Sequence, residues 1–92
     1  MSQYAAVIDV RTPEETSAGY LEGAALFDIQ NSNFMDNLAT LDPAADYYIY
    51  CRSGNRAGQA IQIMQQAGFT GELVNGGSLA NAANQTGLTV VK

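Results

Sequence analysis

The sequence predicts an α/β fold in which a parallel sheet is flanked by helices on both faces. Apolar, strand-like runs alternate with helix-like segments along the chain, and strands separated by helices usually pair in parallel. Residues 5–10, AAVIDV, are almost continuously apolar, as expected for a strand that is covered on both faces. The length of 92 residues suits one small domain, so we expect a single domain over residues 1–92.

The first half of the chain predicts two strands and two helices. After the strand at 5–10, the segment Thr12-Pro13-Glu14-Glu15 is a capping box with proline at the first helical position, so a helix is expected to begin there. Gly19 is expected to end this helix. A second strand is expected at residues 24–29, a short helix at 33–38 and a turn at 41–43.

The second half begins with residues 47–50, YYIY, which have the aromatic and β-branched composition of a strand. We expect these tyrosines to pack in the core rather than to bind a ligand. A helix is expected from Arg56 to Ala67, with Gly68 after its end. Its apolar face follows the helical period and comprises Ala57, Ala60, Ile61, Met64 and Ala67. A strand at 73–74, a short helix at 78–83 and a closing strand at 88–91 complete the prediction.

The composition of the chain narrows its chemistry, because it has one cysteine, Cys51, and no histidine. These counts exclude an internal disulfide, a Ser-His-Asp triad, a Cys-His protease and a metal site built on histidines or several thiolates. The net charge is −5, and the basic residues are Arg11, Arg52, Arg56 and Lys92. Binding of nucleic acid needs a basic face, so we expect no nucleic acid partner.

The hydropathy pattern predicts neither a membrane span nor an export signal. No apolar run approaches the length of a bilayer, and no positively charged start leads into an apolar stretch. We therefore expect a cytoplasmic protein without a membrane partner. A periplasmic or secreted protein whose signal peptide has been removed is the alternative, because its sequence would look the same.

The most informative segment surrounds Cys51, which directly follows the predicted strand at 47–50. In open parallel sheets, ligands bind just outside the carboxyl ends of the strands. Unpaired backbone N–H groups at the start of the following helix form an anion site there, and Gly54 allows a tight turn. Arg52 and Arg56 lie close to Cys51 in the chain, so the cysteine pKa should be depressed and its thiolate nucleophilic. A buried cysteine that only fills space is the alternative.

The chain resembles the rhodanese family over nearly its whole length. The most specific match is the cysteine loop, and the order and spacing of the other segments support it. The matching segments are residues 7–15 (VIDVRTPEE), 19–24 (GYLEGA), 50–57 (YCRSGNRA), 67–69 (AGF) and 75–77 (NGG). The resemblance therefore implies a rhodanese-like α/β fold.

For function, the resemblance implies a thiosulfate sulfurtransferase in which Cys51 carries a sulfane sulfur as a persulfide. A small anionic donor such as thiosulfate would supply the sulfur, and cyanide or a thiol, including a protein thiol, would accept it. The resemblance implies neither a cofactor nor a metal. The loop that would cradle the anion consists of Arg52, Ser53, Gly54, Asn55 and Arg56.

The chain departs from the family pattern outside the cysteine loop. Tyr20 stands where the family often has histidine, Asn81 where it often has tryptophan, and Thr16 where an aromatic residue is usual. These departures bear on packing and substrate access more than on the chemistry. The short segment before the first matching strand resembles small exported members of the family.

Asp9 and Arg11 follow one another closely at the end of the first predicted strand. They could support the cysteine loop from behind. We favour the interpretation that they form a structural ion pair, in which Glu14, Glu15 or Glu22 could join.

Two other classes of protein remain as alternatives. Cysteine-based phosphatases and arsenate reductases also place a loop between a cysteine and an arginine, but usually with one residue more than the four between Cys51 and Arg56. A shorter loop suits a single sulfur atom better than a tetrahedral oxyanion. The second alternative is a non-catalytic rhodanese-like binding module, although such modules usually lack the cysteine.

Overall fold

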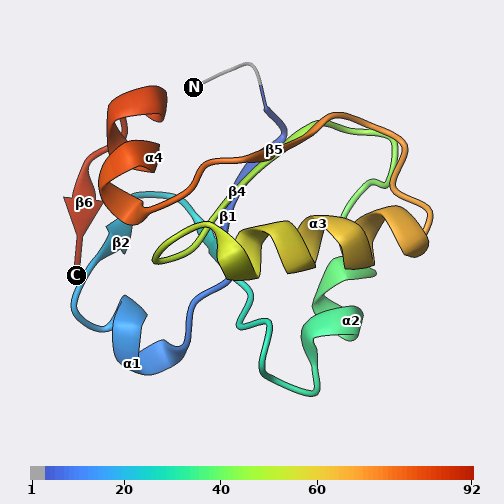
Figure 1. Ribbon diagram of the computed structural model, residues 1–92, viewed down its shortest axis with the longest axis horizontal. Coiled ribbons are helices and arrows are strands. Elements are labelled where there is room, and N and C mark those ends of the chain that lie inside the picture. Colours follow the sequence, from blue (N-terminus) through green and yellow to red (C-terminus); the bar gives the residue numbers. More distant parts are fainter. Residues whose placement is uncertain (1–3) are drawn as a thin grey trace.

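A four-stranded parallel sheet forms the centre of the computed structural model, which describes residues 4–92 (Figure 1). The strand order is β3-β1-β4-β5. The strands of this sheet are β1 (Ala6–Asp9), β3 (Ala25–Leu26), β4 (Tyr47–Tyr50) and β5 (Leu73–Asn75). A separate antiparallel pair is formed by β2 (Tyr20–Leu21) and β6 (Val90–Val91). The predicted α/β class with a parallel sheet is therefore confirmed.

Strand β4 is the most deeply buried element of the sheet, and its residues are at most 4 % exposed. It pairs in parallel with β1 along its whole length, from Tyr47 opposite Ala6 to Tyr50 opposite Asp9. Successive side chains point to opposite faces, so Tyr47 and Ile49 enter one core cluster, and Tyr48 and Tyr50 enter another. The predicted core role of these tyrosines is confirmed.

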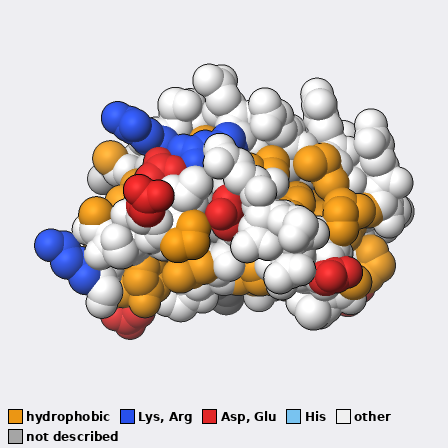
Figure 2. All heavy atoms as spheres, turned by 90° about the horizontal axis from the view of Figure 1, so that it is seen from below, with side chains coloured by type: hydrophobic (Ala, Val, Ile, Leu, Met, Phe, Trp, Pro, Cys, Tyr) orange, Lys and Arg blue, Asp and Glu red, His pale blue; other side chains and the backbone are white. Residues whose placement is uncertain are grey.

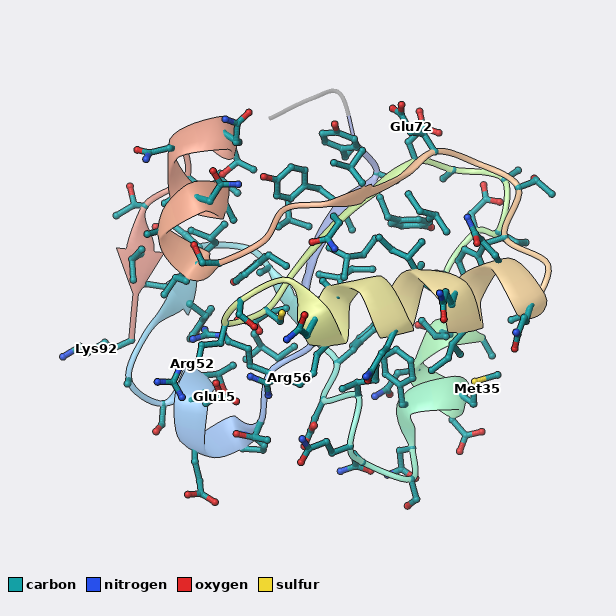
Figure 3. The ribbon with its side chains drawn as sticks, viewed as in Figure 1. Glu15, Met35, Arg52, Arg56, Glu72 and Lys92 are labelled. Carbon is teal, nitrogen blue, oxygen red and sulfur yellow. The ribbon has the colours of Figure 1, made fainter. Side chains whose placement is uncertain are left out.

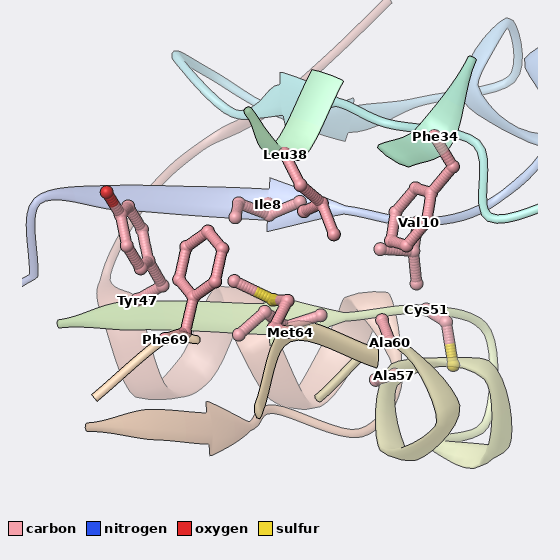
Figure 4. Close-up of a cluster of buried hydrophobic side chains, with 11 residues drawn as sticks. Ile8, Val10, Phe34, Leu38, Tyr47, Cys51, Ala57, Ala60, Met64 and Phe69 are labelled. Atoms are coloured by element: carbon pink, nitrogen blue, oxygen red, sulfur yellow. The ribbon is translucent and has the colours of Figure 1, made fainter. Parts of the chain in front are cut away.

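Helices α2 (Phe34–Leu38) and α3 (Asn55–Gln66) cover one face of the sheet. Ala57, Ala60 and Met64 of α3 are buried against β1 and β4, and Phe69 closes the far end of this cluster (Figure 4). Small alanines let α3 lie close to the sheet. This close approach fixes the start of α3 directly behind the end of β4.

The opposite face of the sheet is covered by α4 (Leu79–Thr86) together with the β2–β6 pair. Ala82 of α4 and Leu21 of β2 are fully buried beside Tyr50. The remaining helix, α1 (Pro13–Thr16), follows β1 at the carboxyl edge of the sheet. Helices therefore flank both faces, as predicted. Within residues 4–92, no helix is long and apolar enough to cross a membrane.

The structure corrects three of the predicted elements. The strand expected at 24–29 is only Ala25–Leu26, because the Asp28 carboxylate accepts a bond from the Gln30 N–H and turns the chain away. The helix expected at 78–83 extends to Thr86 and ends where Gly87 adopts a left-handed conformation (φ 74°). The closing strand expected at 88–91 is limited to Val90–Val91.

Two smaller differences concern the predicted helices. Helix α1 ends at Thr16, before Gly19. Ala67, which was expected on the buried face of α3, is exposed, because it caps the helix end and its backbone N–H bonds back to Ile63 and Met64.

We expect Ile49→Ala to lower the free energy of unfolding by about 2–5 kcal/mol, since it removes a fully buried side chain from the central strand. Chemical denaturation followed by circular dichroism measures this change. Met35→Ala serves as the control, because Met35 is 52 % exposed. An equal effect of both substitutions would contradict the central role of β4 in the core.

Candidate functional site

Cys51 leaves the end of β4 and begins a short loop that enters α3 at Asn55 (Figure 4). Gly54, the residue before α3, has a φ of 95°, which is a left-handed conformation that favours glycine. Cys51 is fully buried, whereas Arg52 and Ser53 are exposed. The turn therefore folds back over the sulfur and directs backbone N–H groups toward it.

The Cys51 sulfur accepts a hydrogen bond from the Gly54 N–H, with an N–Sγ distance of 2.9 Å. Burial by itself raises the pKa of the thiol, but the backbone N–H groups of Ala57, Ser53, Gly54 and Arg56 outweigh it. The pKa of Cys51 is therefore lowered from its ordinary value. The loop and the first turn of α3 favour the nucleophilic thiolate.

Asn75, at the end of β5, holds the cysteine loop from the neighbouring strand. Its side-chain NH2 donates to the Gly54 carbonyl at 3.0 Å, and its side-chain oxygen accepts from the Gly77 N–H at 2.9 Å. The Cys51 N–H in turn donates to the Gly77 carbonyl at 2.9 Å. Sequence analysis did not assign Asn75 to the site. Its position at the carboxyl end of a parallel strand is the signal that could have found it.

Two of the departures from the family pattern, Asn81 and Tyr20, differ in their distance from the cysteine loop. Asn81 on α4 donates from its side chain to the Gly76 carbonyl at 2.7 Å, so it braces the turn that receives the Cys51 N–H. Tyr20 is half-buried in β2 and pairs with Val91. Asn81 thus has a structural contact next to the loop, whereas Tyr20 belongs to the β2–β6 pair.

The two arginines of the loop differ in their partners (Figure 3). Arg56 forms a two-point ion pair with Glu15 of α1, with N–O distances of 2.6 and 2.9 Å. Arg52 is exposed and forms no ion pair within residues 4–92. The bond from Arg56, with smaller contributions from Thr12, lowers the pKa of Glu15 to about 2.

Asp9 and Arg11 form a buried ion pair behind the loop, with a shortest N–O distance of 2.7 Å. Arg11 also donates to the Gly19 carbonyl, and its guanidinium lies 5.8 Å from the centre of the Tyr50 ring. These contacts agree with a structural ion pair at the strand end. Neither Glu14 nor Glu22 joins it among the described residues, and Glu15 pairs with Arg56 instead.

The structure brings the predicted loop residues to one edge of the sheet. Arg52 and Ser53 are exposed in the turn, Asn55 is the exposed first residue of α3, and Gly54 and Arg56 are half-buried. Asp9 and Arg11 lie behind this edge at the end of β1. The arrangement can hold an anionic sulfur at Cys51 and can offer one exposed cation, Arg52, to an incoming anion.

Comparison with known proteins defines the class. Residues 1–83 match the model of the Rhodanese-like domain family. Thiosulfate sulfurtransferase PspE of Escherichia coli K12 is 32% identical over 78 residues, which are 83% of this chain and 72% of PspE. Putative sulfurtransferase YtwF of Bacillus subtilis 168 is 32% identical over 74 residues, covering 80% of this chain and 70% of YtwF.

A longer relative and two solved structures agree with this class. Probable adenylyltransferase/sulfurtransferase MoeZ of Mycobacterium tuberculosis is 34% identical over 65 residues, covering 71% of this chain but only 17% of MoeZ. The Rhodanese_3 like domain of Anabaena Alr3790 superposes with a TM-score of 0.79 at 25% identity, covering 95% of this chain and 98% of that one. A rhodanese with anions from E. coli gives 0.76 at 28% identity, covering 95% and 96%.

The chain therefore belongs to the rhodanese-like domain family, and its curated relatives are sulfurtransferases.

We expect Asn75→Ala to raise the pKa of the Cys51 thiol, because the Gly54 carbonyl and the Gly77 N–H lose the side chain that holds the turn. The ultraviolet absorbance of the thiolate, followed against pH, measures this change. Loss of the two bonds should also cost about 1–2 kcal/mol of stability. Asn84→Ala on the exposed surface of α4 is the control. An unchanged pKa in Asn75→Ala would show that the turn holds its shape without Asn75.

We expect the stabilising contribution of the Glu15–Arg56 pair to disappear in acid. The pKa of Glu15 is lowered in the folded protein from 4.5 to about 2. A depressed carboxyl pKa contributes stability above its unfolded value, and this contribution is lost as the pH falls through the folded value. The stability difference between the wild type and Glu15→Gln should therefore shrink between pH 4.5 and about 2. A difference that is independent of pH over this window would contradict the ion pair.

Proposed function

We propose that this protein transfers a sulfane sulfur from an anionic donor to a thiophilic acceptor through a persulfide on Cys51. The observation that supports this most is the bond from the Gly54 N–H to the Cys51 sulfur. It belongs to a set of backbone donors that lower the thiol pKa although the sulfur is buried. Such donors stabilise negative charge on the sulfur without a neighbouring histidine.

The proposed reaction has two steps at the same sulfur. The Cys51 thiolate attacks the sulfane sulfur of thiosulfate or of a persulfide; the donor S–S bond breaks, and its electron pair leaves with sulfite or a thiolate. Cyanide or an acceptor thiolate then attacks the terminal sulfur, and Cys51 leaves as the thiolate. Every nucleophile and leaving group is an anion, so neither step needs a proton transfer. This accounts for a site that works without histidine.

The terminal sulfur of the persulfide would carry the negative charge in the resting intermediate. The backbone N–H groups of Ser53, Gly54, Arg56 and Ala57, which lower the Cys51 pKa, are the groups that could receive it. Since Cys51 is fully buried before loading, the turn or the side chains around it must move to admit a donor. Exposed Arg52 is the cation placed to attract that donor.

Thiosulfate sulfurtransferase PspE and the anions in the E. coli rhodanese support an anionic donor. The four-residue spacing from Cys51 to Arg56 disfavours a phosphatase or arsenate reductase, because a tetrahedral group on the cysteine needs a wider ring of N–H groups. Arg56 is also already paired with Glu15. Full burial of Cys51 is the one observation that favours a binding module instead.

We expect intact protein incubated with excess thiosulfate to gain the mass of one sulfur atom, and dithiothreitol to remove it. Cys51→Ser should gain no mass and should lose turnover, because Cys51 is the only thiol. Intact-protein mass spectrometry measures loading, and thiocyanate formation from cyanide measures turnover. Steady-state kinetics should be ping-pong, since donor and acceptor meet the same sulfur in turn.

Aryl phosphates and arsenate tested on the same preparation distinguish the alternatives. Hydrolysis or reduction of these substrates without sulfur loading would favour the phosphatase class. Absence of all three activities, with a folded protein, would favour a binding module in which Cys51 is structural.

A further inference from the structure

The cations at the candidate site differ in how much charge they can offer a donor. Arg11 is buried and paired with Asp9, and Arg56 is paired at two points with Glu15. Of these three arginines, only Arg52 is exposed and forms no ion pair within residues 4–92. Figure 2 shows that the visible Lys and Arg side chains gather at one end of the molecule, where acidic side chains adjoin them. The site is therefore close to electrically balanced.

Glu15 is held in this position by the chain's own local structure. Its carboxylate accepts from the Thr12 N–H at 3.3 Å and from the Thr12 hydroxyl at 3.1 Å, as in a capping box at the start of α1. The same carboxylate bonds Arg56 across 41 residues of sequence. Figure 3 shows Glu15 at α1 with Arg56 beside it. The negative charge of Glu15 is therefore held against Arg56 at the start of α3.

The two donor classes differ in the charge that the site must accommodate. Thiosulfate is a dianion, and its transfer of sulfur releases sulfite, which also carries two negative charges. A small alkyl persulfide is a monoanion that releases a thiolate with one charge. Because Coulombic energy scales with the charge of the ligand, a compensated arginine penalises thiosulfate twice as much as the persulfide.

We propose that Glu15 is a specificity-determining residue that neutralises Arg56 and thereby favours monoanionic persulfides over divalent donors such as thiosulfate. The inference rests on the proposed sulfur transfer and defines its donor. In both cases the donor S–S bond breaks, a new S–S bond forms at Cys51, and the electron pair leaves with the departing anion.

Glu15→Gln tests this role with little change of shape. Glutamine keeps a side-chain oxygen for the Thr12 N–H and is itself a capping-box residue, and the same oxygen can accept from Arg56. The substitution removes the negative charge and the second bond, in which Arg56 donates to Oε2. Glu14→Gln is the matched control, because Glu14 is the adjacent exposed carboxylate and forms no ion pair among the described residues.

The measurement is kcat/KM for sulfur transfer to cyanide from thiosulfate and from 2-hydroxyethyl persulfide. In Glu15→Gln we expect about a tenfold gain with thiosulfate and about a threefold gain with the persulfide, because the logarithm of the gain follows the donor charge. Glu14→Gln should change both values by less than about twofold, since an exposed unpaired charge is screened. Added salt should reduce the thiosulfate gain.

An Arg56→Met background tests whether Glu15 acts through Arg56. In that background, Glu15→Gln should no longer change the preference between the two donors. The inference is overturned if Glu15→Gln leaves the ratio of the two kcat/KM values unchanged, if Glu14→Gln shifts it equally, or if the shift persists without Arg56. A folded wild-type protein that loads sulfur from neither donor would overturn the proposed function itself. Thermal unfolding of each variant separates these outcomes from a loss of fold.

Discussion

The buried end of β4 is the constraint on which the rest of the structure depends. The chain leaves this strand at Cys51 and must enter α3, which packs closely on the same sheet, within a few residues. Gly54, in a left-handed conformation, makes this turn, and the Cys51 sulfur at the buried end of β4 is shielded from solvent. Backbone N–H groups of the loop and of the first turn of α3, which have no partner within the helix, therefore converge on the sulfur. The chemistry of the site follows from this reversal of the chain.

The neighbouring parallel strands supply the supports of that turn, because their carboxyl ends meet at the same edge. Strand β5 ends at Asn75, whose side chain holds Gly54, and β1 ends at Asp9. Asp9 is fully buried, and a buried carboxylate is costly unless it is paired. Arg11 satisfies it and also bonds the Gly19 carbonyl. The buried Asp9–Arg11 pair therefore fixes the segment that follows β1, and this segment includes α1 with Glu15.

Sequence reasoning succeeded where structure is encoded locally. The aromatic run of β4, the periodic face of α3 and the capping box of α1 each depend on residues that lie close together in the chain. The parallel sheet could be predicted because strand-like and helix-like segments alternate along the sequence. The cysteine loop could be singled out because Cys51, Gly54 and Arg56 lie close in the chain. The β2–β6 pairing and the bonds of Glu15 and Asn75 could not be predicted, because they join distant segments and leave no local pattern.

The balance of charge around Cys51 has a consequence for both halves of sulfur transfer. In the proposed reaction Cys51 is the nucleophile toward the donor, and nucleophilicity falls as the thiol pKa falls. Toward the acceptor it is the leaving group, which departs faster at a lower pKa. An intermediate pKa serves both steps. Backbone N–H groups lower the pKa of Cys51 whereas burial raises it, so the turn and the depth of the sulfur act in opposite directions. In the proposed transfer these opposed effects set the reactivity of the sulfur, and the Glu15–Arg56 pair limits the charge that is offered to the donor.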